Sequence, residues 1–63
     1  MSIKEQQFIK AGNTEGQFVK LRKYYRCNVV LAKRGLFINY AEIARMLKKN
    51  KQWAYYWYRF LFN

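Results

Sequence analysis

The chain of 63 residues contains no histidine, no aspartate and no proline, a single cysteine, and only three carboxylate side chains, all of them glutamates. Enzymes that use acid and base groups or metal ions need pairs or clusters of the residue types that are missing. One cysteine cannot form an internal disulfide, and the usual metal ligand, histidine, is absent. We therefore expect neither an enzyme nor a protein with a metal or another cofactor.

Long apolar runs are missing as well. No stretch approaches the roughly 20 apolar residues that cross a bilayer, and the polar run from Lys4 to Gln7 lies where a secretory signal would carry its apolar core. The lone Cys27 fits a reducing compartment. Its thiol could be reactive beside the basic residues Lys23 and Arg26, but a small buried apolar role is the simpler interpretation.

Basic residues dominate the charge, with 13 Lys and Arg against three acids and a net charge of +10. Such a charge opposes compaction and accelerates association with polyanions. The hydrophobic fraction of 52% argues against disorder. A chain of this length buries only about 60% of its unfolded surface, so its core depends on dense aromatic packing or on self-association. We expect a folded domain whose partner is a polyanion.

Capping signals and apolar spacing predict four helices. The first lies within residues 1–12: it opens at Ser2, where Glu5 completes a Ser-x-x-Glu box, and it ends at Gly12. The side chains expected to dock it on the rest of the chain are Ile3, Phe8 and Ile9.

A second helix is predicted from about residue 15 to 33, in a supporting segment that spans 15–34. Thr14 faces Gln17 in another capping box, and Gly35 stands where a helix ends. However, "CNVVLA" and "LFINYA" flank the turn "KRG", so a β-hairpin over residues 27–40 stays open as an alternative. The apolar stripe expected to face the core consists of Phe18, Leu21, Tyr25, Val29 and Ala32.

The last third, "NYAEIARMLKKNKQWAYYWYRFLFN", predicts two short helices. Asn39 and Glu42 form the box of the third helix, which stops by Lys49, and Asn50 caps a fourth helix from Lys51 to about residue 61. Their apolar faces consist of Ile43, Met46 and Leu47 in the third and Ala54, Trp57 and Leu61 in the fourth. The chain is therefore expected to be one all-α domain of three or four helices.

Two short helices joined by a turn of about three residues have the geometry of a helix-turn-helix, whose second helix enters the major groove of DNA. The segment "YAEIARMLKKNKQWAYYWYRF", within residues 40–61, resembles the helix-turn-helix superfamily of DNA-binding proteins. Ile43 and Leu47 match the apolar positions of the first helix. Ala44 matches the small residue that lets the helices approach, and Ala54 and Trp57 match the inward positions of the second helix.

The turn departs from the pattern of this superfamily. Lys48 stands where glycine is usual, and Lys49 stands where an apolar residue is usual. Lys48 would then adopt a positive φ at a cost of about 1 kcal/mol, unless the turn takes another form.

The resemblance implies that the outward side of the second helix faces double-stranded DNA. Gln52 can pair with adenine and Arg59 with guanine, while basic residues elsewhere neutralise phosphates. The residues expected to bind DNA are Arg22, Lys23, Arg26, Arg45, Lys48, Lys49, Asn50, Lys51, Gln52, Tyr55, Tyr56 and Arg59.

The aromatic residues of the last helix have a different expected role. Seven aromatics lie between residues 53 and 62, more than a thin core needs, which suggests a homodimer like the two-fold readers of operator DNA. The residues expected in the core or the dimer interface are Trp53, Trp57, Tyr58 and Phe60. From the resemblance and the size, we expect a stand-alone regulator or accessory protein of the phage or plasmid type, in the cytoplasm of a bacterial or archaeal host.

Three other functions stay open. Tyr and Trp in a basic setting can stack on single-stranded nucleic acid or RNA: joint exposure of Tyr55, Tyr56 and Tyr58 would favour that function, and burial of Trp57 with Tyr58 would favour a duplex reader. An inhibitor or other protein partner of the nucleic-acid machinery is the second. The third is a membrane-active cationic peptide, similar in size and charge to leaderless bacteriocins, although a mean hydropathy of −0.46 makes a membrane partner unlikely.

Overall fold

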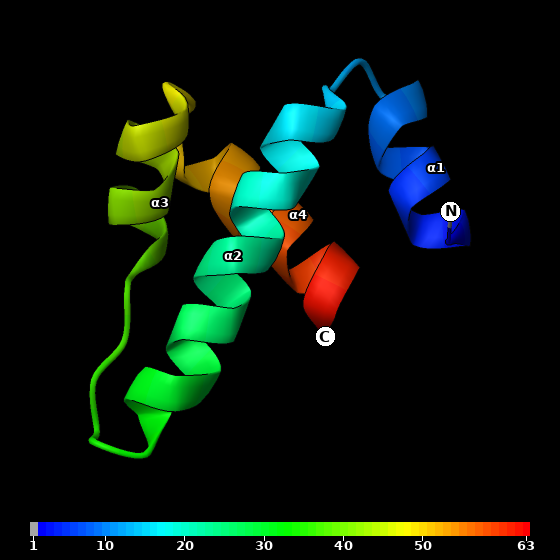
Figure 1. Cartoon of the computed structure of the whole chain (residues 1–63). Coiled ribbons are helices and arrows are strands. Elements are labelled where there is room, and N and C mark those ends of the chain that lie inside the picture. Colours follow the sequence, from blue (N-terminus) through cyan, green and yellow to red (C-terminus); the bar gives the residue numbers. More distant parts are fainter. Residues whose placement is uncertain (1) are drawn as a thin grey trace.

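Four helices make up the fold, as the computed structural model of the chain shows for residues 2–63, the part it describes (Figure 1). No strand occurs among these residues, so the predicted all-α class is confirmed. The β-hairpin over residues 27–40 is wrong, because the second helix continues to Ala32 and a loop follows it. The helices are α1 (Ile3–Lys10), α2 (Glu15–Ala32), α3 (Tyr40–Leu47) and α4 (Lys51–Phe62).

The predicted beginning of each helix is confirmed by its cap. A side-chain oxygen of the capping residue accepts a hydrogen bond from the backbone N–H three residues later, which satisfies a donor that the helix start leaves free. The capping residues are Ser2, Thr14, Asn39 and Asn50. At the start of α2 the second hydrogen bond of a capping box is also present, because the Thr14 N–H donates to Oε1 of Gln17 at 2.9 Å. The boxes predicted with Glu5 and Glu42 are not closed, and Glu42 pairs with Arg45 instead.

A residue with a positive φ lies at or shortly after the end of each of α1, α2 and α3. Gly12 has φ 99° and Gly35 has φ 71°, as expected of glycines that close a helix. Lys48 ends α3 with φ 58° and ψ 41°, so of the two alternatives left open for this turn the structure has the positive φ. The N–H of Lys49 then donates to the carbonyl of Ala44 at 2.9 Å, so the chain turns sharply into α4.

A small and largely aromatic core joins all four helices. The fully buried ring of Phe8 on α1 has its centre 6.2 Å from that of Phe18, 6.1 Å from Trp53 and 5.0 Å from Trp57. The other buried apolar residues are Leu21, Ile43, Ala44, Leu47, Ala54 and Tyr58. Because Trp53 and Trp57 also pack against this cluster, their predicted core role is confirmed along with that of Tyr58.

Several predicted core positions are wrong. On α2, Val29 is 50% exposed and Ala32 is exposed, because the last turns of this helix extend beyond α3 and α4 (Figure 1) and have no helix to pack against. Ile3 on α1 and Met46 on α3 are also largely exposed. On α4, Tyr58 is more deeply buried than Trp57, and Phe60 is half-buried beside Tyr56.

One polar side chain, Asn28 of α2, is buried within this apolar setting, at 5% exposure. Its Oδ1 accepts from the Ile38 N–H at 2.7 Å, and its Nδ2 donates to the Ile38 carbonyl at 3.3 Å and to the Tyr58 hydroxyl at 3.0 Å. Burial raises the pKa of Tyr58 above its ordinary value, and the bond from Asn28 partly opposes that rise. Asn28 therefore fastens both the loop after α2 and helix α4 to α2.

Replacing Asn28 should destabilise the fold strongly. Asn28→Ala leaves buried polar groups of Ile38 and Tyr58 without partners, so we expect a loss of about 2 to 4 kcal/mol in the free energy of unfolding, out of roughly 3 to 9 kcal/mol for a chain of this length. Tyr58→Phe removes one of the bonds and should cost about 1 kcal/mol. Urea unfolding followed by tryptophan fluorescence measures both. The exposed Asn63→Ala is the control, and a loss for Asn28→Ala no larger than that of this control would contradict the assigned role.

Candidate nucleic-acid interface

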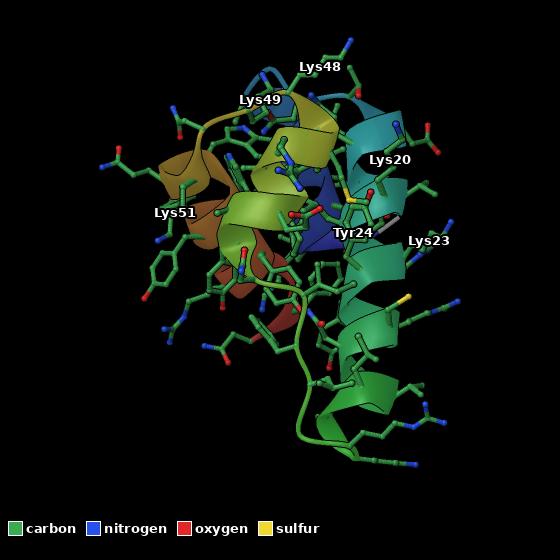
Figure 2. The ribbon with its side chains drawn as sticks, turned by 90° about the vertical axis from the view of Figure 1, so that its left-hand side faces the viewer. Lys20, Lys23, Tyr24, Lys48, Lys49 and Lys51 are labelled. Carbon is green, nitrogen blue, oxygen red and sulfur yellow. The ribbon has the colours of Figure 1, made fainter. Side chains whose placement is uncertain are left out.

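All twelve side chains predicted to contact DNA are exposed. They do not form one surface, however. The structure divides them into two groups: one on α3, the following turn and the exposed side of α4, with Tyr56 at the edge of that side, and one on α2. Figure 2 looks onto α3, with α2 and α4 on either side of it.

The turn between α3 and α4 is strongly basic. Lys48 and Lys49 lie at the end of α3, and Lys51 lies at the start of α4 (Figure 2). The Nζ of Lys49 is 5.4 Å from the centre of the Trp53 ring, which holds this cation near the turn. On α3, Arg45 forms an ion pair with Glu42, and hydrogen bonding to that carboxylate raises the pKa of Arg45.

Helix α4 has one buried and one polar side. Ala54 is fully buried and Tyr58 is 8% exposed, whereas Lys51, Gln52 and Arg59 are exposed. Gln52 and Arg59 are seven residues apart, so two helical turns separate them and both lie on the same side of α4, about 10 Å apart along its axis. That separation corresponds to about three base-pair steps of B-DNA.

Two tyrosines hold Arg59 in place. Its Nη1 donates to the Tyr55 hydroxyl at 2.9 Å, and its guanidinium carbon is 5.4 Å from the centre of the Tyr55 ring. The Tyr55 ring in turn makes an edge contact with Tyr40 of α3, with 5.0 Å between ring centres. Because a guanidinium has five N–H donors, most of the donors of Arg59 stay available to a ligand while its position is restrained.

Tyr56 lies at the edge of the exposed side of α4, one helical turn after Gln52. Its ring is 61% exposed, but it contacts Trp57 at 4.9 Å and is stacked on Phe60 at 6.3 Å between ring centres. The Nζ of Lys4 on α1 lies 5.9 Å from the centre of the Phe60 ring. The structure therefore brings Tyr55 together with Arg59, and Tyr56 together with residues that face α1.

The predicted DNA contacts on α2 are also separate from the α4 surface. Arg22, Lys23 and Arg26 line a hollow together with Val19 and Cys27. In Figure 2, Lys23 on α2 and Lys51 on α4 lie on opposite sides of α3. Cys27 is half-buried, so its predicted apolar role is confirmed only in part.

Lys20 is a basic residue of the surface that sequence reasoning missed. It lines a hollow of about 360 Å³ with Lys48 and Met46, where the first half of α2 meets the end of α3 (Figure 2). The sequence marks Lys20 only as a position outside the buried stripe of α2. Its proximity to Lys48, 28 residues later, depends on how the two helices pack.

The chain has no significant match among protein-family models, curated proteins or solved structures. Over residues 2–63, none of the helices combines the length and the apolar character needed to cross a membrane. Within the same residues, no three Cys, Asp or Glu side chains come together in a way that could hold a metal ion.

The left-handed residue in the turn gives a testable prediction. Lys48→Gly relieves the strain of a positive φ, and after the larger backbone entropy of glycine in the unfolded chain is subtracted, we expect a gain of roughly 0.5 kcal/mol in the free energy of unfolding. Lys49→Gly removes the same charge at a residue whose φ is not positive, and it should lower stability. Thermal unfolding of both variants measures the difference in stability. An equal loss of stability in the two variants would contradict the prediction.

Proposed function

We propose that the protein binds double-stranded DNA through α3, the turn from Lys48 to Asn50, and α4, with α4 in the major groove. The observation that carries this proposal is the division of α4 into a buried side, with Ala54 and Tyr58, and an exposed polar side directly after a basic turn. A helix with its side chains is about 10 to 12 Å wide, and the major groove is about 12 Å wide.

Each group of this surface has a role that follows from its chemistry. Gln52 and Arg59 are the base readers, because glutamine matches the edge of adenine and arginine that of guanine. The contact with Tyr55 orients Arg59 before DNA arrives. The surrounding cations bind phosphates of the DNA backbone. These contacts fix the register of the protein on the duplex without reading the base sequence. These cations are Lys20, Arg45, Lys48, Lys49 and Lys51.

Single-stranded nucleic acid or RNA is the second candidate ligand, since Tyr55 and Tyr56 are 46% and 61% exposed. Stacking needs free ring faces. The ring of Tyr55 is engaged by Tyr40 and Arg59, whereas that of Tyr56 is offset from Phe60 and stays largely exposed. Tyr58 is buried, so the three tyrosines are not exposed together, and this arrangement favours duplex DNA.

In biological terms, we propose a stand-alone regulator or accessory protein of the phage or plasmid type. This part of the proposal rests on the resemblance of residues 40–61 to helix-turn-helix proteins and on the small size of the chain. A cytoplasmic location in a bacterial or archaeal host follows from the same resemblance.

Binding measurements test the choice of ligand and the base readers together. Fluorescence anisotropy with mixed-sequence duplex DNA, single-stranded DNA, RNA and anionic liposomes should give the tightest binding for the duplex. The logarithm of the affinity should fall with the logarithm of the salt concentration by about 0.9 for each phosphate contact. On a site selected from a random pool, Gln52→Ala and Arg59→Ala should each weaken binding by about 1 to 3 kcal/mol.

Matched controls are available for both substitutions. Gln6→Ala on α1 and Arg34→Ala in the loop after α2 remove the same residue types at exposed positions outside the proposed surface, and they should change the affinity by less than about twofold. Preference for single strands, RNA or liposomes, or equal effects of the variants and their controls, would contradict the proposal.

A homodimer on DNA is a separate prediction. The number of aromatic residues in α4 is now a weaker argument for a dimer, because several of these rings have partners within the chain. Phe62, for example, stacks on Tyr25 with 4.7 Å between ring centres. The remaining reason is that readers of this kind share a two-fold symmetry with their sites. Sedimentation at micromolar concentration should detect two chains per selected site, and a monomer both with and without DNA would refute the dimer.

A further inference from the structure

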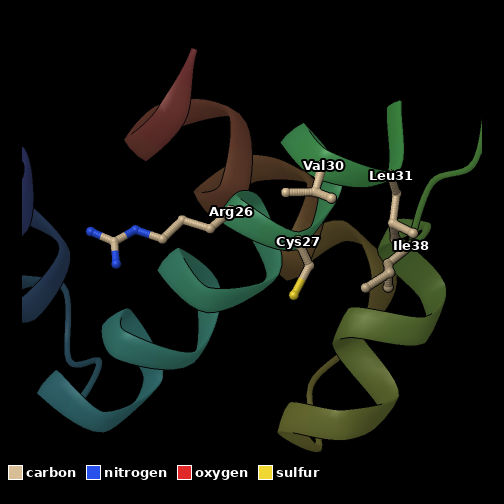
Figure 3. A pocket seen from close by; sticks show the side chains of 5 residues that line it. All are labelled: Arg26, Cys27, Val30, Leu31 and Ile38. Atoms are coloured by element: carbon tan, nitrogen blue, oxygen red, sulfur yellow. The ribbon is translucent and has the colours of Figure 1, made fainter. Parts of the chain in front are cut away.

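Two adjoining hollows follow the exposed side of α2, outside the surface proposed to bind DNA. The larger, of about 460 Å³, is lined by Arg26, Cys27, Val30, Leu31 and Ile38 (Figure 3). The smaller, of about 250 Å³, is lined by Val19, Arg22, Lys23, Arg26 and Cys27. Because Arg26 and Cys27 border both, we treat them as one feature, the α2 groove. It extends from Val19 to Val30, about 16 Å along the helix.

The α2 groove combines accessible valines with basic side chains, because Lys23 and Arg26 lie between Val19 and Val30 along its length. Val19 is 46% exposed and Val30 is 60% exposed. Leu36 and Phe37, in the loop that follows α2, are 55% and 54% exposed. Adjacent exposed apolar side chains of this size typically mark a site of interaction with another protein.

At the Val30 end of the α2 groove, one lining residue comes from outside α2 and is fixed without a ligand. This residue is Ile38, and both its N–H and its carbonyl are bonded to the buried side chain of Asn28, at 2.7 and 3.3 Å. Leu31, on the last turn of α2, lies beside Ile38 at the same end of the hollow (Figure 3). A groove that is already formed costs less ordering entropy when a partner binds.

The charge around the α2 groove is predominantly positive, although Glu15 lies one turn before Val19 on the same side of α2. Residues 22–39 include five cations and no carboxylate, and no described carboxylate lies within ion-pair distance of these cations. The cations are Arg22, Lys23, Arg26, Lys33 and Arg34. A second copy of the chain on this groove would bring like charges together, which is unfavourable, whereas an acidic partner would be complementary.

We propose that the α2 groove binds an amphipathic helix of a partner protein, with apolar residues along one side and glutamate or aspartate on both flanks. The apolar residues would lie over Val19, Cys27 and Val30, and the carboxylates would meet Lys23 and Arg26. About eleven residues, or three turns, are enough to follow the groove, which is the usual way in which a helix is recognised in an apolar channel. This inference does not depend on DNA binding.

A synthetic peptide tests the proposal on the full chain. The probe is a fluorescein-labelled helix of about 18 residues, with leucines at i, i+4, i+7 and i+11 and glutamates on both flanks. Two control peptides carry lysine in place of every glutamate, or serine in place of every leucine. At physiological salt, anisotropy should detect the acidic amphipathic peptide and show binding at least about tenfold weaker for each control peptide.

Two variants locate the binding. Val30→Glu puts a carboxylate into the groove and should weaken binding of the acidic peptide at least about tenfold. Ile3→Glu makes the same change at an exposed aliphatic residue of α1, so it should have less than about a twofold effect. Unchanged thermal unfolding of both variants would establish that they fold.

Alkylation of Cys27 provides an independent measurement. Cys27 is the only cysteine of the chain and lines both hollows, so the acidic peptide should slow its reaction with iodoacetamide and the lysine peptide should not. Absence of binding, equal binding of the lysine peptide, or equal effects of the two variants would overturn the proposal. A wild-type dimer that Val30→Glu converts to a monomer would also overturn it, because the occupant would then be a second copy.

Discussion

The hydrogen bonds of Asn28 are the interaction on which the arrangement of the chain most depends. This amide is buried among apolar side chains, where each unsatisfied polar group costs about 1 to 3 kcal/mol, and it joins α2 to Ile38 and to Tyr58. Tyr58 contacts Tyr40 with 5.3 Å between ring centres, and Tyr40 contacts Tyr55, on which Arg59 lies. A continuous series of contacts thus connects a buried amide on α2 with an exposed guanidinium on α4.

Aromatic rings have a second role that follows from the scarcity of acids. With three carboxylates for 13 cations, most cations cannot find an ion-pair partner, and several lie over aromatic rings instead. Each such contact contributes about 0.5 to 1 kcal/mol at an exposed site, so rings in the core and rings at the surface both hold cations. The pairs are Lys4 with Phe60, Arg22 with Phe18, Lys49 with Trp53, and Arg59 with Tyr55.

Features set by neighbouring residues could be predicted from the sequence, and features set by packing could not. The caps at Ser2 and Asn50 depend on a few adjacent residues, and each was predicted correctly, while the positive φ of Lys48 was one of two alternatives for its turn. The burial of Asn28 depends on its packing against Ile38 and Tyr58, and the exposure of Val29 depends on where α2 runs beyond its neighbours. The same holds for the candidate site, because the sequence indicated which side chains are exposed but not that the cations of α2 lie apart from those of α4.

The separation of the two basic surfaces has an electrostatic consequence. The chain measures 35 × 23 × 16 Å along its principal axes, and the Debye length at physiological salt is about 8 Å, half of the shortest dimension. Charges on opposite sides of α3 are therefore largely screened from each other. An acidic helix on α2 would compete with DNA on α4 only slightly under these conditions, and more strongly at low salt. For the two proposed partners, screening therefore limits repulsion across α3, but not near Lys20, which lies one helical turn from Lys23 of the α2 groove and is assigned to the proposed DNA surface.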